Sequence, residues 1–148
     1  MKGFMVTRSL LAVVLVFACI GNAMADEISQ KSAALWRVVQ TEFSLIVVPA
    51  ARNFISNKIT VASLKAGGES LSTEAITKVL QQSSPVKLAI ASESDAVAAA
   101  TLERAFLGLK GKIQVAHEVA FIGDKEYEET LVNKAADIGI KLIFVPYP

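Results

Sequence analysis

The feature that most constrains the fold is an alternation of short apolar runs and amphipathic stretches after Pro85. Residues 86–91 (VKLAIA) are typical of a buried strand, and residues 95–109 carry apolar side chains at helical spacing. Alternating apolar residues predict a long strand over 112–122. A further helix leads to KLIFVP, residues 141–146, which we predict as a final strand. This β-α-β-α-β order favours parallel strands joined by crossovers.

The helix before the last strand has its own start and stop signals. Asp124 can cap it, because its side chain can accept hydrogen bonds from free backbone amides. Leu131, Val132, Ala135 and Ile138 form its apolar stripe, and the glycine that follows them is expected to adopt the left-handed conformation that ends a helix; that glycine is Gly139.

The first half of the chain has a weaker pattern. Residues 27–43 carry apolar side chains at helical spacing and predict a helix. The β-branched run LIVVP, residues 45–49, follows as a short strand or as a continuation of that helix. Residues 58–64 are a further candidate strand, and the glycines of KAGGES, residues 65–70, predict a flexible turn.

Residues 72–81 predict another helix. Ser72 is its expected N-cap, and Leu71 with Ile76 occupies the two positions of a hydrophobic staple. The whole pattern predicts a small three-layer α/β domain with a mostly parallel sheet of four or five strands. The β-α-β-α-β order after Pro85 is its clearest part.

Residues 1–25 have the organisation of a cleaved signal peptide. Two basic residues, Lys2 and Arg8, precede an apolar run over 10–20, and Ala23 and Ala25 place small side chains where a signal peptidase reads them. We therefore expect an exported protein, periplasmic or secreted in a bacterium. Residues 26–148 then form a single domain.

Two alternatives use the same leader. An uncleaved anchor needs about 20 apolar residues, roughly twice the run present here. Lipidation would use Cys19, but the bulky Phe17 stands where a small residue is usual. Cleavage leaves 13 basic against 14 acidic residues, because Lys2 and Arg8 are lost, so the formal charge becomes −1. It also removes the only cysteine, so the mature chain carries no disulfide.

The mature composition excludes several chemistries. A chain without cysteine has no thiol nucleophile, iron–sulfur cluster or cysteine zinc site, and His117 is its only histidine. We expect His117 in mid-strand, in a structural role. The sequence contains no phosphate-binding glycine loop and no nucleophile elbow, and its basic residues are scattered. These absences favour a non-enzyme and predict no cofactor, no catalytic set and no nucleic-acid partner.

Polar side chains follow the predicted strands where ligands of open parallel sheets bind, beyond the carboxyl ends. The candidate ligand-binding residues come from two turns and the tail: Ser92, Glu93, Ser94, Asp95, Asp124, Lys125 and Tyr147. Helix capping alone also accounts for the first turn, because a serine can cap the helix while the two acids complement its dipole. Both interpretations stay open at this point.

The functional prediction is a non-catalytic binding or protein-interaction module for an unknown protein or small-molecule partner, without stable membrane insertion after cleavage. It requires an exposed apolar patch or an unpaired sheet edge. The alternative is small-ligand or divalent-metal binding at residues 92–95 and 123–125, which requires a concave pocket. In that alternative Glu93, Asp95 and Asp124 would hold an ion, or Glu93 and Asp95 would act as acid and base in a hydrolysis. We predict no metal site from the residues themselves.

Overall fold

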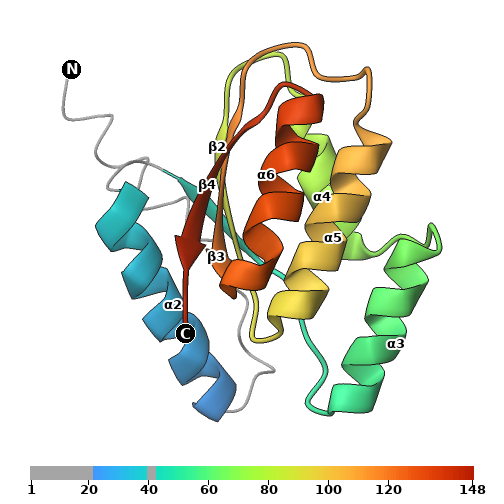
Figure 1. Ribbon diagram of the computed structural model, residues 1–148. Helices are drawn as coiled ribbons and strands as arrows, with labels where there is room; N and C mark the ends of the chain where they lie inside the picture. The colour runs from blue at the N-terminus through green and yellow to red at the C-terminus, as the bar shows by residue number, and fades with distance from the viewer. Residues whose placement is uncertain (1–21, 40–42) are drawn as a thin grey trace.

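Four strands form a parallel sheet between one helix on one face and a layer of helices on the other (Figure 1). The computed structural model describes residues 22–39 and 43–148. The elements are α2 (Asn22–Val39), β1 (Ser44–Val47), α3 (Phe54–Lys65), α4 (Leu71–Leu80), β2 (Lys87–Ala91), α5 (Asp95–Gly108), β3 (Glu118–Gly123), the 3-10 helix η1 (Lys125–Tyr127), α6 (Glu128–Asp137) and β4 (Lys141–Pro146). This arrangement confirms the predicted α/β class and the parallel sheet.

The strands cross the sheet in the order of the sequence, β1-β2-β3-β4, and each neighbouring pair is parallel. Leu88 of β2, for example, pairs with Ser44 on one side and with Val119 on the other. Strand order does not reverse anywhere in the sheet. Open α/β sheets form a ligand crevice where strand order reverses. This sheet therefore does not provide that crevice through its topology.

The two faces of the sheet differ in side-chain size because successive residues of a strand point to opposite faces. Leu88 and Ile90 belong to the core beneath α4, α5 and α6. Ala89, Ala91 and Ala120 pack instead with residues of α2. These short side chains let a single helix lie close to that face. The α2 face is therefore where a long side chain from a helix can reach the strand ends.

Helix α2 starts before the predicted cleavage bond and ends at Val39. Ile28, Leu35 and Val39 are buried, as their helical spacing predicts. Most of the predicted signal peptide, residues 1–21, lies outside the described residues. Among the helices that the structure describes, none is long and apolar enough to cross a membrane.

The elements after Pro85 mostly match their predictions. Strand β2, helix α5 and strand β4 lie within one residue of the predicted bounds. Gly139 has a φ of 79° and follows α6 in the left-handed conformation, as predicted. The predicted strand at 45–49 is present as β1, which begins one residue earlier and ends two residues earlier than predicted.

The predicted strand over 112–122 is wrong in its first half, because β3 begins only at Glu118. Its neighbours begin at Lys87 and Lys141, so residues before Glu118 have no strand to pair with. His117 therefore precedes the strand instead of lying within it. It is 1% exposed, and its Nδ1 accepts a hydrogen bond from the Val86 amide at 3.0 Å.

The candidate strand at 58–64 is also wrong, since these residues belong to helix α3. Asn53 caps the helix by accepting from the Ser56 amide at 2.6 Å. The Asn57 side chain adds two bonds to the backbone of Ala51. These caps outweigh the β-branched residues in the segment. The KAGGES turn lies where it was predicted, with Gly67 at a φ of 99°.

Helix α4 starts one residue earlier than predicted, and Ser72 is not its cap. Ser70 accepts from the Thr73 amide at 3.2 Å, while the Thr73 hydroxyl accepts from the Ser70 amide at 2.8 Å. This reciprocal pair is a capping box with threonine in the usual glutamate position. Leu71 is 85% exposed, so the predicted staple with Ile76 does not form.

Asp124 caps the 3-10 turn η1 instead of helix α6. Its Oδ1 accepts from the Glu126 amide at 2.9 Å. Tyr127 stands at the N-cap of α6 and makes no side-chain cap bond. In the predicted stripe of that helix, Leu131 and Ala135 are buried, but Val132 is exposed.

Candidate functional site at the carboxyl edge of the sheet

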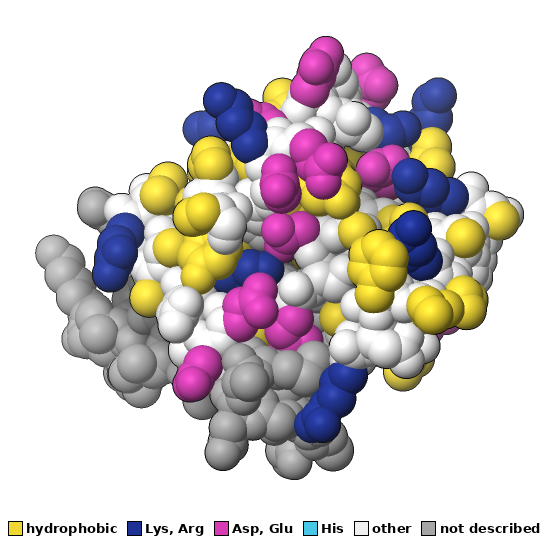
Figure 2. All heavy atoms as spheres, turned by 60° about the horizontal axis from the view of Figure 1, so that its bottom comes forward, with side chains coloured by type: hydrophobic (Ala, Val, Ile, Leu, Met, Phe, Trp, Pro, Cys, Tyr) yellow, Lys and Arg dark blue, Asp and Glu magenta, His cyan; other side chains and the backbone are white. Residues whose placement is uncertain are grey.

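The carboxyl ends of the strands lie at the lower edge of Figure 1, and Figure 2 turns that edge towards the reader. Acidic side chains run through the middle of this face. Hydrophobic and basic side chains lie to its right, on the side where Figure 1 places α3. The predicted candidate residues lie in and around the acidic region, so we describe this edge first.

Ser92 and Ser94 form the turn between β2 and α5. Ser94 is the N-cap of α5, because its Oγ accepts from the Val97 amide at 3.3 Å. Ser92 is fully buried, and its Oγ accepts from the Ser94 amide at 3.1 Å. The two hydroxyls thus serve the backbone of the turn, as the capping interpretation expects.

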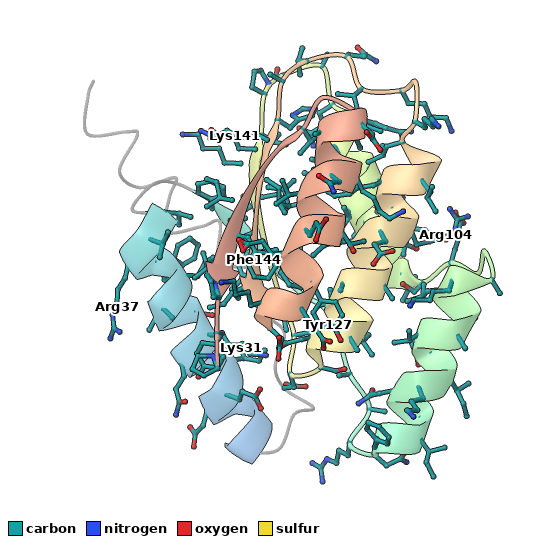
Figure 3. The ribbon with its side chains drawn as sticks, in the orientation of Figure 1. Lys31, Arg37, Arg104, Tyr127, Lys141 and Phe144 are labelled. Atoms are coloured by element: carbon teal, nitrogen blue, oxygen red, sulfur yellow. The ribbon has the colours of Figure 1, made fainter. Side chains whose placement is uncertain are left out.

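Lys31 of α2 reaches into the same turn from the opposite face of the sheet (Figure 3). It is 1% exposed, the most unusual burial in the described chain for a residue that carries a full charge. Its Nζ donates to the Ser92 carbonyl oxygen at 2.6 Å and to Asp95 Oδ1 at 2.7 Å, and lies 3.3 Å from Glu27 Oε1. The ammonium therefore donates two hydrogen bonds and forms ion pairs with two carboxylates.

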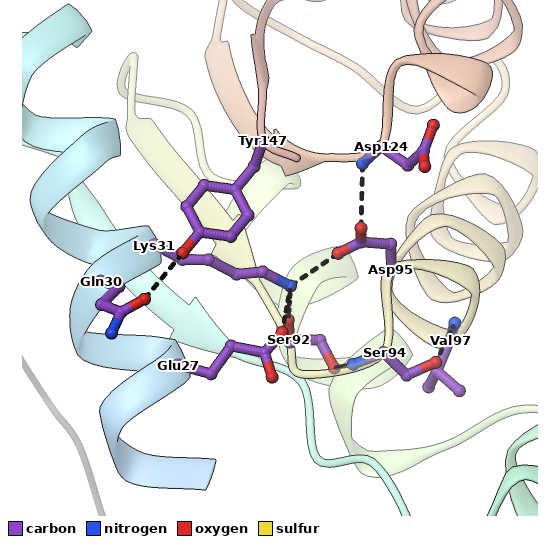
Figure 4. A network of polar contacts seen from close by, with 9 residues as sticks. All are labelled: Glu27, Gln30, Lys31, Ser92, Ser94, Asp95, Val97, Asp124 and Tyr147. Carbon is purple, nitrogen blue, oxygen red and sulfur yellow. Dashed lines mark hydrogen bonds and ion pairs between the residues drawn. The ribbon is translucent and has the colours of Figure 1, made fainter. Parts of the chain in front are cut away.

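Asp95 joins three segments that are distant in sequence (Figure 4). One carboxylate oxygen accepts from Lys31 of α2, and the other accepts from the Asp124 amide at 2.9 Å. Asp95 also occupies the first turn of α5, where a negative charge is favourable. The carboxylate therefore ties the starts of α5 and η1 to α2.

Sequence reasoning missed Lys31 as the centre of this network. Two local signals were present. Lys31 lies on the buried stripe of α2 between Ile28 and Leu35, and Glu27 precedes it by one helical turn. Neither signal identifies the partner, because Asp95 is 64 positions away.

Glu93 makes no hydrogen bond or ion pair with the residues that the structure describes. Its side chain is half-buried, and its Oε1 is buried without a hydrogen bond in the described structure. Burial raises the pKa of Glu93 above its ordinary 4.5, the nearby charge of Glu27 raises it further, and Lys31 partly opposes this. Glu93 therefore has a higher proton affinity than an ordinary glutamate.

Tyr147 closes the network from the carboxyl-terminal side. Its amide donates to the Gly123 carbonyl at 2.9 Å, and its hydroxyl donates to Gln30 Oε1 at 3.1 Å. Lys31 Nζ lies 5.6 Å from the centre of its ring, within the range of a cation–π contact. The carboxyl-terminal tail is thus held against α2 through Gln30 and Lys31.

An open pocket of about 310 Å³ lies beside Tyr147. It is lined by Asp124, Lys125, Pro146, Tyr147 and Pro148, so three of the predicted site residues border one hollow. Ser92 and Asp95 are not part of its wall. The structure therefore divides the predicted set into a buried network and a shallow surface pocket.

The candidate ion ligands Glu93, Asp95 and Asp124 are not assembled around one point. Asp95 is occupied by Lys31 and by a backbone amide, and Asp124 Oδ1 accepts from Glu126. In the part of the chain that the structure describes, no three acidic, histidine or cysteine side chains form a group suited to a metal. The ammonium of Lys31 pairs with Asp95 and with Glu27.

Tyr127 lies at the same edge and has a raised pKa. Burial, a hydrogen bond with Glu126 and the charges of Glu126, Asp95 and Asp124 raise its pKa to about 12. Such a phenol stays protonated at neutral pH and is a poor base. The contacts of Lys31 and Asp95 hold α2, α5 and η1 together at this edge.

Family models, curated proteins and solved structures were compared with this chain, and none of them matches it. The argument for function therefore rests on the residues described above.

Proposed function

We propose that the protein is an exported, non-catalytic binding module whose docking surface is helix α3. The observation that carries this proposal is the exposure of three large hydrophobic side chains on that helix. Phe54, Ile55 and Ile59 are 71%, 70% and 65% exposed. The leader pattern of residues 1–25 supports export.

Helix α3 is covered on one side. Among the described elements it packs mainly on α5, with Leu64 buried and Val61 half-buried. Ile55, Ile59 and the exposed Ala62 follow one another at i, i+4 and i+7, so they share the opposite side. Single exposed hydrophobic residues are ordinary, but a row of them on one helix face is typical of an interaction surface. Phe54 is exposed beside this row, in the first turn of the helix. We call Phe54, Ile55, Ile59 and Ala62 the α3 stripe.

The state of the polar network supports a role without catalysis. Lys31 donates hydrogen bonds to Ser92 and Asp95 and forms an ion pair with Glu27. A lysine nucleophile needs a free lone pair, which an ammonium paired with two carboxylates does not offer. In this network those groups contribute to the fold.

A second candidate is small-ligand binding in the pocket beside Tyr147. Its volume of about 310 Å³ suits a small molecule, and Lys125 and Asp124 offer charges of both signs. Substituting Lys125 with alanine tests this candidate, since Lys125 is exposed and its loss leaves the buried network intact.

The α3 proposal is tested by in-cell cross-linking of the exported protein. Wild type is compared with Ile55→Ser/Ile59→Ser and with Leu107→Ser, a matched variant because Leu107 is also exposed (60%) but lies on α5. We expect cross-linked or co-fractionating material that is lost in the α3 variant and kept in the α5 variant. Equal results for all three proteins, both in cross-linking and in co-fractionation with membranes, would contradict the proposal.

A further inference from the structure

The segment that carries the α3 stripe has charge of one sign only. Between Phe43 and Gly68 the sequence contains no acidic residue, while Arg52, Lys58 and Lys65 are basic. All three are exposed, and none forms an ion pair with the described residues. Their charge is therefore available to a partner.

Two of the basic side chains, Lys58 and Lys65, lie beside the α3 stripe. Lys58 follows Phe54 by one helical turn, and its Nζ lies 4.7 Å from the centre of the Phe54 ring. Lys58 also lies one turn from Ala62, and Lys65 follows Ala62 at i+3. An apolar row bordered by lysines suits an anionic membrane surface, where apolar side chains are buried and basic side chains meet lipid phosphates.

The helix is already formed and held before any partner binds. Asn53 caps its start, and Arg104 of α5 donates to the Gly68 carbonyl at 3.1 Å just beyond its end. Arg104 also pairs with Glu69 at 3.3 Å. Binding therefore does not have to order the segment, which removes one cost of association.

Self-association through this surface is disfavoured by its charge. A symmetric contact between two α3 helices would bring the basic residues of both copies together without an intervening acid. An anionic bilayer instead offers phosphates to the lysines and an apolar interior to the stripe. The acidic side chains in the middle of Figure 2 lie beside α3 on the same face and would be repelled by such a bilayer, so contact is expected through α3 alone.

We infer that α3 is a docking surface for an anionic lipid bilayer, with Phe54, Ile55 and Ile59 entering the interface and Arg52, Lys58 and Lys65 contacting lipid phosphates. This inference rests on the proposed function of α3 and names its partner. The attachment is peripheral and reversible, because three apolar side chains and three charges are far fewer contacts than a membrane-spanning helix makes.

Vesicle co-sedimentation of the exported protein tests the inference. The probes are vesicles of phosphatidylcholine alone and vesicles that also contain phosphatidylglycerol. The variants are Lys58→Glu and Ile59→Ser, with Lys110→Glu and Leu107→Ser as matched controls at exposed positions away from α3. All proteins are prepared either with residues 1–25 or without them, so these residues do not affect the comparison.

We expect binding to the anionic vesicles only, weakened by salt. Lys58→Glu should reduce the partition constant by roughly fivefold or more, since each basic residue near such a surface contributes about that factor. The two controls should bind like wild type. No anionic binding, or equal losses in Lys110→Glu and Lys58→Glu, would overturn the membrane inference.

Two further outcomes separate this inference from the proposed function. If Ile59→Ser abolishes cross-linking to a protein while vesicles are not bound, the membrane inference fails and the α3 docking surface stands. If α3 variants change neither cross-linking nor vesicle binding, both fail. Circular dichroism of each variant checks that α3 substitutions leave the fold intact, which is expected because the substituted side chains are exposed.

Discussion

Lys31 Nζ lies 2.7 Å from Asp95 Oδ1, and this contact links a helix on one face of the sheet to a helix on the other. The lysine is nearly inaccessible, whereas the aspartate side chain is 22% exposed. A buried cation is tolerated only when it is paired and hydrogen-bonded. The pair therefore makes the position of α2 dependent on the turn that follows β2.

Replacing Lys31 with methionine should destabilise the fold by about 3 kcal/mol, because the Ser92 carbonyl and one oxygen of Asp95 lose their donor in a buried setting. Urea unfolding measures this loss. Lys110→Met is the matched control, since Lys110 is exposed and should change the free energy of unfolding by no more than about 0.5 kcal/mol.

The double variant Lys31→Met/Asp95→Asn measures the interaction free energy between the two residues. Removing both charges leaves no unpaired buried ion, so the double variant should lose less stability than the two single variants combined, with a coupling of about 0.5–3 kcal/mol. Strict additivity would show that the two residues act independently.

Ser94→Ala should cost about 1 kcal/mol of stability, because the Val97 amide loses its acceptor at the start of α5. Ser94→Asn should recover most of this loss, since asparagine is an equally good cap. Thermal unfolding compares the three proteins. A Ser94→Ala protein as stable as wild type would show that the cap bond contributes nothing.

Gly123→Ala should be destabilising for a steric reason. A Cβ at this position would lie 2.8 Å from Phe121 Cε1 and 3.1 Å from Asp95 Cγ. Phe121 is fully buried, so the new methyl group must displace Asp95 or strain the core, at a cost of about 1–3 kcal/mol. The free energy of unfolding is measured for Gly123→Ala, for Asp95→Asn and for the double variant. We expect the two losses not to add, because both changes affect the same contact.

Gly139→Ala serves as the control for that experiment. Its Cβ would meet nothing within 4 Å, and only its φ of 79° makes alanine unfavourable, at about 1–2 kcal/mol. This loss should add to that of Asp95→Asn. Coupling of equal size at both glycines would contradict the proposed contact between residue 123 and Asp95.

The sequence predicted the elements whose signals are local. Periodicity and terminal residues located β2, α5 and β4, and Gly139 marked the end of α6. The strand at 112–122 was extended too far because alternation in a sequence does not show where a partner strand begins. In α3, one capping asparagine, Asn53, outweighed a β-branched segment.

The candidate site could be predicted only in part, because strand order places some of its residues and not others. Parallel strands bring their carboxyl ends together, so Asp95 and the Asp124 segment could be placed at one edge from strand order alone. Lys31 could not be placed there, because that requires knowing that α2 covers the small-residue face of the sheet. A buried ion pair between distant residues leaves little trace in local pattern.

The export prediction can be checked by intact-mass measurement of protein recovered outside the cytoplasm. Cleavage between Ala25 and Asp26 should remove residues 1–25 and leave Asp26 as the first residue, five positions before Lys31. The shortened α2 keeps Glu27 and Lys31, so the network in Figure 4 should survive. A retained leader, or a lipid on Cys19, would contradict the prediction.

Glu93→Gln should raise stability at neutral pH and have little effect in acid. The pKa of Glu93 is raised in the folded protein, chiefly by burial, so the folded state binds this proton more tightly than the unfolded chain does. The stabilisation that this proton provides is fully present below pH 4.5, the ordinary pKa of glutamate. It is lost as the pH rises through the pKa that Glu93 has in the folded protein. Glutamine carries no proton to lose, so the difference in the free energy of unfolding between Glu93→Gln and wild type should grow from near zero in acid to a constant at neutral pH.

Glu129→Gln, an exposed change in the first turn of α6, is the control and should instead cost a few tenths of a kcal/mol. Urea unfolding of the three proteins across this pH range measures both effects, and a Glu93→Gln protein less stable than wild type at neutral pH would show that the carboxylate has a favourable partner.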